Sequence, residues 1–488
     1  MTTSVPGQPG SPVTPGAGGP PAHGTDDGAT NTSDTPVVNS IFAAQYRTLT
    51  LGIVAVTTVA AFEAMGVITA MPAAATDLDA LTWYAWGSTA FAVASLFAMA
   101  TAGGWADRAG PVPPLVTGLG AFSLGLVLAG VAPEMWVLLA GRALQGLGFG
   151  GVIVAIYVVI GRAYPEHLRP RVFTALSGAW VIPGITGPLV AGIITETIGW
   201  RWVFFGVLLL LAPIAAVLIP RLQAMHVAPD PNAVELKGRK TLALLAAAGT
   251  GLLQLSGQRL DVLTPFLALI ALVALGYSIP KLLPSGALRL KRGLPTVVML
   301  RGFFAGAFFG TEWFIPLFLV NERELSFALA GAALSGAAVG WFIGSWYQGR
   351  PSTEMSRYAL VRLGALMTTL GIGLSAAIVI DSIPWWVIVL TWTIGSFGMG
   401  ILFGSLGVLL LEQSAPEKQG VNSAALQMAD QLGVIFCTGL GGVIFAAGHT
   451  EAGQDGNVYL TIFSVMLAIG VFATLVSGRA EPKVTQAA

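Results

Sequence analysis

Long apolar blocks, each of about 20 residues, recur along almost the whole chain and restrict what it can fold into. A helix of this length spans the ~30 Å hydrocarbon core of a bilayer, because each residue adds about 1.5 Å. Only 10% of the 488 residues are charged, whereas soluble domains carry about 25%. With a mean hydropathy of +0.76, the chain is predicted to be an all-α membrane protein.

Fourteen apolar segments are predicted to cross the membrane. They are 48–70, 83–103, 115–132, 135–160, 171–195, 202–220, 241–257, 262–280, 296–320, 326–347, 358–380, 385–411, 421–447 and 458–477. The weakest of them is 241–257, which is short and ends in Gln254 and Ser256. Gly and Pro inside the other segments do not exclude them, since membrane helices tolerate both.

These segments are arranged as six, two and six, which predicts two six-helix bundles joined by two central helices. Residues 1–40 are rich in Gly, Pro, Ser and Thr and lack an apolar core, so they are expected to form a disordered tail. The predicted domains are 1–40 (N-terminal tail), 41–220 (first bundle), 221–295 (linker with two helices), 296–478 (second bundle) and 479–488 (C-terminal tail).

The distribution of basic residues predicts the orientation. With the N-terminus in the cytoplasm, twenty of the 24 Lys and Arg fall inside, three (Arg201, Arg259 and Arg323) fall outside, and Arg142 lies within a span. The positive-inside rule predicts such an asymmetry for correctly counted helices. We therefore expect a multi-pass inner-membrane protein with both termini in the cytoplasm.

Composition also excludes other classes. The formal net charge is zero, so no global field favours nucleic acid as a partner. Cys437 is the sole cysteine and excludes an intrachain disulfide. The four histidines have no ligand spacing within a span, and no phosphate-binding loop or Cys/His cluster is present. The chain is therefore not expected to be an enzyme.

Three motifs occur in order in the first half. The first, Gly-Gly-Trp-Ala-Asp-Arg-Ala-Gly at 103–110, contains Gly103, Asp107, Arg108 and Gly110, and its glycines are expected to form a tight turn between the second and third spans. The alternative is that these residues form an ordinary Gly/Asp turn without a functional role. Pro111-Val112-Pro113 follows this motif directly.

The second motif lies in the fourth span, where Arg142 and Gln145 occur in Arg-Ala-Leu-Gln-Gly. A charged residue inside a span is costly unless it faces a cavity or a partner, so Arg142 is a functional candidate. A structural Arg bonded to Gln145 or to backbone carbonyls is the alternative.

The third motif lies in the fifth span and contains Pro183, Gly187, Pro188 and Gly192. Small residues allow close helix approach and prolines kink the helix. The alternative is that this Gly-rich face only packs against other helices. The sixth span then opens with Trp-Arg-Trp-Val-Phe-Phe at 200–205.

Together these motifs resemble the major facilitator superfamily, in its fourteen-helix drug:proton antiporter branch. The resemblance implies two related bundles around a central cavity and no metal or covalent cofactor. It implies that the 103–110 loop latches the bundles on the cytoplasmic side, and that the fifth-span motif is typical of exporters. An ion gradient would then drive transport.

Three acids within spans are candidates for proton coupling, with Arg142 as the responding charge. Glu63 and Glu312 each lie about 16 residues, or ~24 Å, past the cytoplasmic start of the first span of their bundle. Asp430 lies nearer the cytoplasm, where Gln427 and Gln431 are possible local partners. A carboxyl group removed from water favours its neutral form, so each acid could exchange a proton near neutral pH. Structural roles are the alternatives.

Aromatic and Met side chains within the spans are candidates for lining a substrate cavity, because they contact apolar or cationic molecules with little demand on shape. They are Phe91, Tyr157, Trp180, Trp313, Trp341, Trp392 and Met428. Helix packing or interfacial belts are the alternative for each of them.

The sequence thus predicts a monomeric exporter that exchanges protons for an amphipathic small molecule across the lipid bilayer. Three alternatives remain open: a proton-coupled nutrient symporter, a lipid or glycolipid exporter whose two extra helices open a lateral path, and a receptor or scaffold without transport. Intramembrane charges disfavour the scaffold, since such groups are costly.

Overall fold

The computed structural model describes residues 40–165, 167–224, 238–258, 263–350, 354–415, 419–450 and 455–482. The predicted N-terminal tail lies outside these residues apart from Ser40, as do 483–488 of the C-terminal tail. Within them every long element is an α-helix, which confirms the all-α fold.

The first helices are α1 (Ala44–Asp77), α2 (Trp86–Ala109), α3 (Val112–Gly130), α4 (Met135–Ala163), α5 (Arg169–Gly178), α6 (Val181–Thr197) and α7 (Arg201–Ala224). Two further helices, α8 (Arg239–Gln258) and α9 (Thr264–Leu282), follow. The last six are α10 (Leu294–Asn321), α11 (Phe327–Gly349), α12 (Arg357–Ala376), α13 (Val387–Glu412), α14 (Gln419–Gly448) and α15 (Gly456–Val476). Short 3-10 turns, such as η1 (Leu81–Trp83) and η2 (Ala287–Arg289), join some of them.

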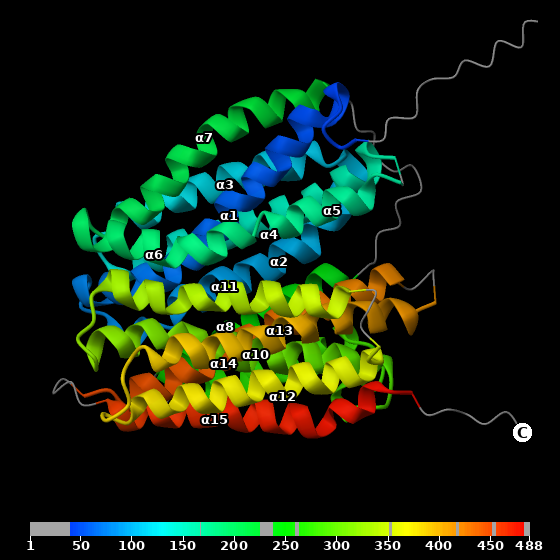
Figure 1. Cartoon of the computed structure of the whole chain (residues 1–488). Helices are drawn as coiled ribbons and strands as arrows, with labels where there is room; N and C mark the ends of the chain where they lie inside the picture. Colours follow the sequence, from blue (N-terminus) through cyan, green and yellow to red (C-terminus); the bar gives the residue numbers. More distant parts are fainter. Residues whose placement is uncertain are drawn as a thin grey trace, which may run out of the picture. The chain divides into compact units, whose positions relative to one another are not determined.

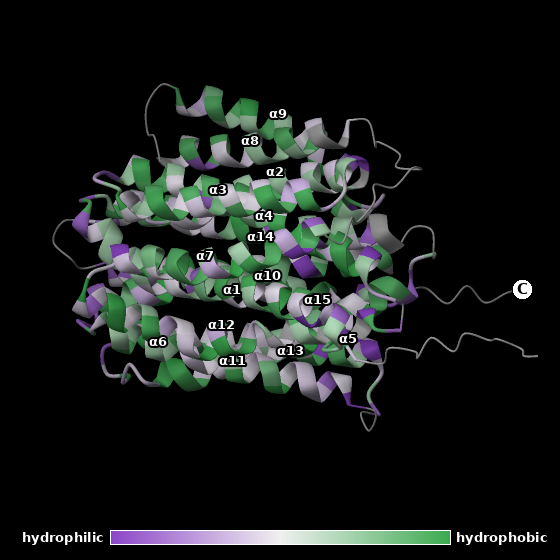
Figure 2. Cartoon of the chain, turned by 90° about the horizontal axis from the view of Figure 1, so that it is seen from above, coloured by the Kyte–Doolittle hydropathy of each residue, from purple (hydrophilic) through white to green (hydrophobic). Residues whose placement is uncertain are grey.

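Among the described helices, twelve are long and apolar enough to cross a membrane. Two shorter apolar helices, Val181–Thr197 and Thr241–Gly257, correspond to the fifth and seventh predicted spans. The count of fourteen spans therefore stays a prediction. Hydrophobic residues run along the helices, and hydrophilic ones gather toward the helix ends (Figure 2).

The fifth predicted span, in which prolines were expected to kink the helix, is interrupted. It divides into α5 and α6 at Ala179 and Trp180. Pro183 explains the break, because proline has no N–H to donate to the carbonyl four residues earlier, and its ring clashes with that carbonyl. That carbonyl belongs to Ala179, where the helix is interrupted.

The turn expected over 103–110 is also much shorter than predicted. Gly103 lies inside α2, which continues to Ala109 with the exposed Arg108 in its last turn. The chain turns at Gly110, whose φ of 79° is in the region that only glycine adopts easily. The side chain of Asp107 lies outside the described residues.

The contacts among helices repeat between the two groups of six. α4 packs on α2 and α3, as α13 packs on α11 and α12, and α1 contacts α7 as α10 contacts α15. The two groups are distinct in Figure 1, with α1 to α7 (blue to green) above and α10 to α15 (yellow-green to red) below. α8 packs on α9, α2 and α14, so the central pair of helices touches both groups. The predicted domain boundaries stay a prediction.

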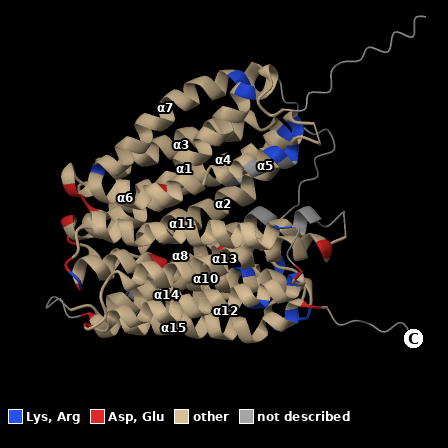
Figure 3. Cartoon of the chain, in the orientation of Figure 1, with Lys and Arg blue, Asp and Glu red and all other residues tan. Residues whose placement is uncertain are grey.

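Most described Lys and Arg residues lie at one end of the helices (Figure 3). We expect a reporter domain fused after Lys483, or inserted between α7 and α8, to be cytoplasmic, because the positive-inside rule places that end there. A reporter inserted after Glu324, between α10 and α11, should be external and serves as the matched control. Protease or thiol-probe access in intact cells measures each location, and an external reporter after Lys483 would contradict the orientation.

Candidate functional site

A buried ion pair joins α1 and α4. One terminal nitrogen of Arg142 donates hydrogen bonds to Oε1 of Glu63 and to Oε1 of Gln145. Its Nε donates to the backbone oxygen of Gly87 in α2 at 3.0 Å. The guanidinium carbon lies 4.6 Å from the centre of the Phe91 ring. Arg142 and Glu63 are only 3% and 1% exposed, so the structure brings together four of the predicted site residues.

Local sequence explains this arrangement. Arg142 and Gln145 are three residues apart and so share one face of α4. The next residue, Gly146, lets α2 approach, because a Cβ there would collide with the backbone oxygen of Phe91. That close approach brings the Gly87 carbonyl and the Phe91 ring to the guanidinium. Arg142 is therefore held from three helices.

The pair leaves one carboxylate oxygen without a partner. Within the described part of the chain, Oε2 of Glu63 has no hydrogen-bond donor, and Nε2 of Gln145 has no acceptor. An ionised oxygen buried without a donor is unfavourable. Oε2 of Glu63 is therefore the atom that can take up a proton without breaking an existing hydrogen bond.

Glu312 has a similar position in the second bundle but a different partner. It lies 18 residues past the first residue of α10, as Glu63 lies 19 residues past that of α1. Nε1 of Trp392 in α13 donates to its Oε1 at 3.3 Å, and its Oε2 is unpartnered among the described residues. Helices α10 and α13 correspond to α1 and α4, so Trp392 stands on the helix that matches the one bearing Arg142.

Asp430 is paired with Arg301. Arg301 is one of the twenty basic residues that the sequence predicts on the cytoplasmic side. Nε of Arg301 in α10 lies 3.2 Å from Oδ1 of Asp430 in α14. Its guanidinium carbon lies 3.3 Å from the centre of the Phe403 ring. The sequence suggested Gln427 and Gln431 as possible local partners of Asp430. The structure pairs it with Arg301 instead. Arg301 falls inside the predicted 296–320 span, and this position was the available signal.

The aromatic candidates fall into two sets. Trp392 stacks on Phe308 with ring centres 4.5 Å apart, and Trp341 contacts Phe308 and Phe403 at 6.0 and 5.1 Å. Of these rings, Trp392 contacts Glu312 directly, and Phe403 lies against Arg301. Trp313 is buried beside them on α10, with its ring 5.5 Å from that of Tyr84.

The other candidates form different contacts. Tyr157 is 45% exposed and packs edge-on against Phe173 at 5.6 Å. Trp180 is half-buried at the α5–α6 break. Met428 packs in a separate apolar cluster with Ala92 and Leu96 of α2.

The fifth-span motif forms part of the interface between the two groups of helices. A Cβ at Gly331 of α11 would collide with the backbone oxygen of Pro188, and a Cβ at Gly192 would collide with that of Phe327. Gly187 instead faces Met65 of α1, and Pro183 is buried. The motif therefore allows close packing of α6 on both α1 and α11.

Two hydrogen bonds also join the two groups of helices. The hydroxyl of Tyr84, just before α2, donates to the backbone oxygen of Trp313 at 2.6 Å. The backbone N–H of Ala328 at the start of α11 donates to Glu196 near the end of α6 at 3.4 Å.

Known proteins show the same family and fold. The family model described as Major Facilitator Superfamily matches residues 53–438. A probable multidrug-efflux transporter of Mycobacterium tuberculosis is 27% identical over 435 residues, covering 83% of this chain and 89% of the relative. Multidrug resistance protein 3 of Bacillus subtilis is 25% identical over 397 residues, covering 79% and 76%.

Solved structures extend the likeness to the fold. A D-xylose–proton symporter superposes with a TM-score of 0.61 at 16% identity, covering 89% of this chain and 98% of the symporter. An inward-facing bacterial homologue of the human lysosomal transporter Spinster superposes with a TM-score of 0.60, also at 16% identity, covering 88% and 96%. From the family match over most of its length, the chain belongs to the major facilitator superfamily and is a multi-pass membrane transporter.

Proposed function

We propose that this transporter exports amphipathic organic compounds in exchange for protons, as a monomer in the inner membrane with both termini in the cytoplasm. The observation that carries the proposal is the Glu63–Arg142 pair with its unpartnered carboxylate oxygen. An ionisable pair inside a membrane is costly to maintain, so a role in the transport cycle accounts for its presence. The names of the two multidrug relatives support export.

Protonation of Glu63 would weaken its attraction to Arg142, because a neutral carboxyl keeps a hydrogen bond but loses the ion pair. Arg142 is also bonded to Gly87 of α2 and contacts Phe91. A shift of the Arg142 side chain would therefore change contacts with α1, α2 and α4 together. This link would couple proton binding to rocking of one bundle against the other.

The cluster around Glu312 supports a cationic amphipathic substrate. Glu312 forms no ion pair with a Lys or Arg within the described part of the chain. Its partner Trp392 is itself stacked on Phe308. A carboxylate beside aromatic faces attracts an organic cation through charge and through the ring electrons. The apolar rings would contact the rest of the molecule.

Flux in proteoliposomes tests the proposal. The purified transporter, reconstituted with an imposed pH gradient, should move a fluorescent organic cation toward the proton-rich side and release protons to the other side. Collapsing the gradient with an ionophore should stop uphill movement. Movement of dye and protons in the same direction would favour a symporter, and flux that ignores the gradient would contradict proton coupling.

Replacing Glu312 with glutamine should lower export of a cationic dye by about tenfold, because a cation loses one attractive charge of roughly 1–2 kcal/mol. Export of a neutral amphiphile of similar size should change little. Glu324→Gln, at an exposed acid beyond the end of the same helix, is the matched control. Equal losses for both substrates would place Glu312 in proton coupling instead.

A further inference from the structure

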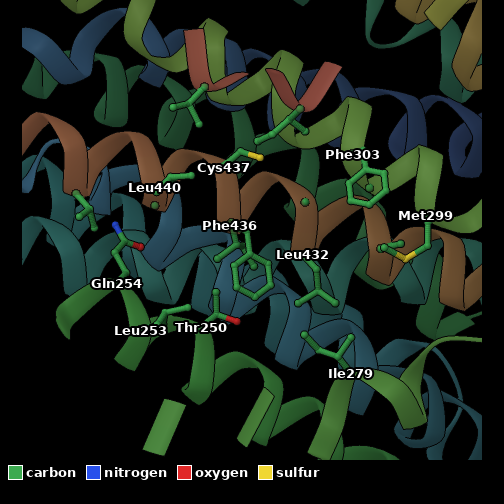
Figure 4. A pocket seen from close by; sticks show the side chains of 18 of the residues that line it. Thr250, Leu253, Gln254, Ile279, Met299, Phe303, Leu432, Phe436, Cys437 and Leu440 are labelled. Carbon is green, nitrogen blue, oxygen red and sulfur yellow. The ribbon is translucent and has the colours of Figure 1, made fainter. Parts of the chain in front are cut away.

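A large cavity lies between the central helix pair and the second bundle, apart from the Glu63–Arg142 pair and the aromatic cluster around Glu312. It has a volume of about 880 Å³ and is lined by α8, α9, α10, α14 and α15. Figure 4 shows apolar side chains such as Leu253, Phe303 and Leu432 around it. Ligand pockets are commonly about 300–1,000 Å³, so this cavity is large enough to hold a molecule.

One polar side chain in the wall has no partner. Gln254 of α8 is 4% exposed, and neither its Nε2 nor its Oε1 forms a hydrogen bond among the described residues. Its amide lies against α14, where a Cβ at Gly439 would be 3.3 Å from Oε1. A buried amide without a partner is unfavourable, so a bound molecule that supplies one would be stabilising.

The other polar groups of the wall on α8 are already satisfied. The hydroxyl of Thr250 donates to the backbone oxygen of Ala246 at 2.6 Å, and that of Ser256 donates to Leu253 at 2.7 Å. Among the described residues of the wall, the buried amide of Gln254 is therefore the polar side chain left without a partner. A molecule that fits the cavity has a long apolar part and a polar group at one position.

The cavity is elongated along the helices. Its wall on α14 runs from Ala429 to Val443, which is about 20 Å by helical rise. One leaflet of hydrocarbon is roughly 15 Å deep, half of the ~30 Å bilayer core. Gln254 is four residues from the end of α8 at Gln258, whereas Met299 lines the opposite end of the cavity.

The cavity also borders the surface that faces lipid. Leu440 and Phe472 line it and are 42% and 46% exposed. Many large apolar side chains of α9 are exposed as well, including Phe266, Leu269 and Ile270. A chain of lipid can therefore enter from the side, with its polar part near the α8 end and its apolar part extending along α14.

We propose that this cavity binds one acyl chain of a membrane phospholipid from the leaflet on the side of the α8–α9 turn. Nε2 of Gln254 donates to the acyl ester carbonyl, and Oε1 accepts from a hydroxyl or ammonium group of the headgroup. The bound lipid forms a wall between the central helices and the second bundle. This gives the central pair a role that does not depend on the driving force or direction of transport.

Photo-crosslinking of the full-length protein tests the site. A phospholipid with a diazirine in the middle of one acyl chain is added to the purified transporter, and labelled peptides are mapped by mass spectrometry. Label is expected on α8, α14 and α15. Gln254→Leu should reduce it about 3- to 10-fold, as loss of one hydrogen bond implies. Thr241→Val, at an exposed hydroxyl near the start of α8 and outside the cavity wall, should leave it unchanged.

Cys437 provides an independent readout, because it is the sole cysteine and it lines the same cavity. Added phospholipid should slow its alkylation by a small maleimide several-fold, and free fatty acid should do so less well. Ala468→Phe, which places a ring in the cavity from α15, should abolish both crosslinking and lipid protection while the protein still unfolds cooperatively. Equal protection by a fatty acid, or crosslinking that is unchanged in Gln254→Leu and Ala468→Phe, would overturn the proposal.

Discussion

Glu63→Gln is expected to reduce export driven by a pH gradient to the background of vesicles that lack the transporter. Glutamine keeps the size of the side chain and an oxygen that accepts from Arg142, but it cannot bind or release a proton. Exchange of labelled for unlabelled substrate without a gradient should keep most of its rate, because the bundles can still rock. The two rates are measured side by side in inverted vesicles.

The matched control is Glu134→Gln, at an exposed acid just before α4. It carries the same chemical change outside the apolar interior and should leave both rates intact. A purely structural role for Glu63 would instead lower both rates together with thermal stability. Full gradient-driven export by Glu63→Gln would show that the proton site is elsewhere, with Asp430 as the next candidate.

Arg142→Ala is expected to destabilise the fold by about 3–5 kcal/mol, because it leaves a buried carboxylate without its partner. Glu63 would then favour its neutral form at neutral pH, and export would be lost. The Glu63→Gln/Arg142→Ala pair should recover part of the stability, since no ionised group then remains buried at this position. Thermal unfolding of the four proteins forms a double-mutant cycle that measures the coupling.

Arg201→Ala is the matched control for this change. Arg201 pairs with Asp77 at 2.8 Å, but the two side chains are 38% and 51% exposed, and exposed pairs contribute up to about 1 kcal/mol. Its loss should therefore affect stability much less than the loss of Arg142. Similar losses of stability for the two variants would show that burial does not make the Glu63–Arg142 pair more important for stability than an exposed pair.

Glu63 and Arg142 could be predicted from the sequence because the lipid interior does not solvate charged groups. A Glu or an Arg inside a long apolar segment is rare and costly, so Glu63 and Arg142 stand out without any structure. The one-turn spacing of Arg142 and Gln145 further indicates a shared helix face. Their joint contact with α2, through Gly87 and Phe91, depends on helix packing, and no pattern within one span reports it.

Asp430 shows the opposite case. Its neighbours on the same helix, Gln427 and Gln431, were plausible partners from spacing alone, yet Arg301 lies 129 residues away in sequence and pairs with it. Similarly, Gln254 counted only as a weakness of the seventh span. Its burial against Gly439 and its place in the cavity wall became visible once α8 was packed on α14.

The class of protein, the approximate helices and the costly intramembrane charges follow from local sequence, because helix length and hydrophobicity must match the bilayer locally. The family motifs are local features as well. Tertiary packing sets which charges meet, where α5 and α6 separate within the fifth span, and what lies between the central helices and the second bundle. Those features depend on side chains from distant segments that approach in space, and local hydropathy contains no information about such approaches.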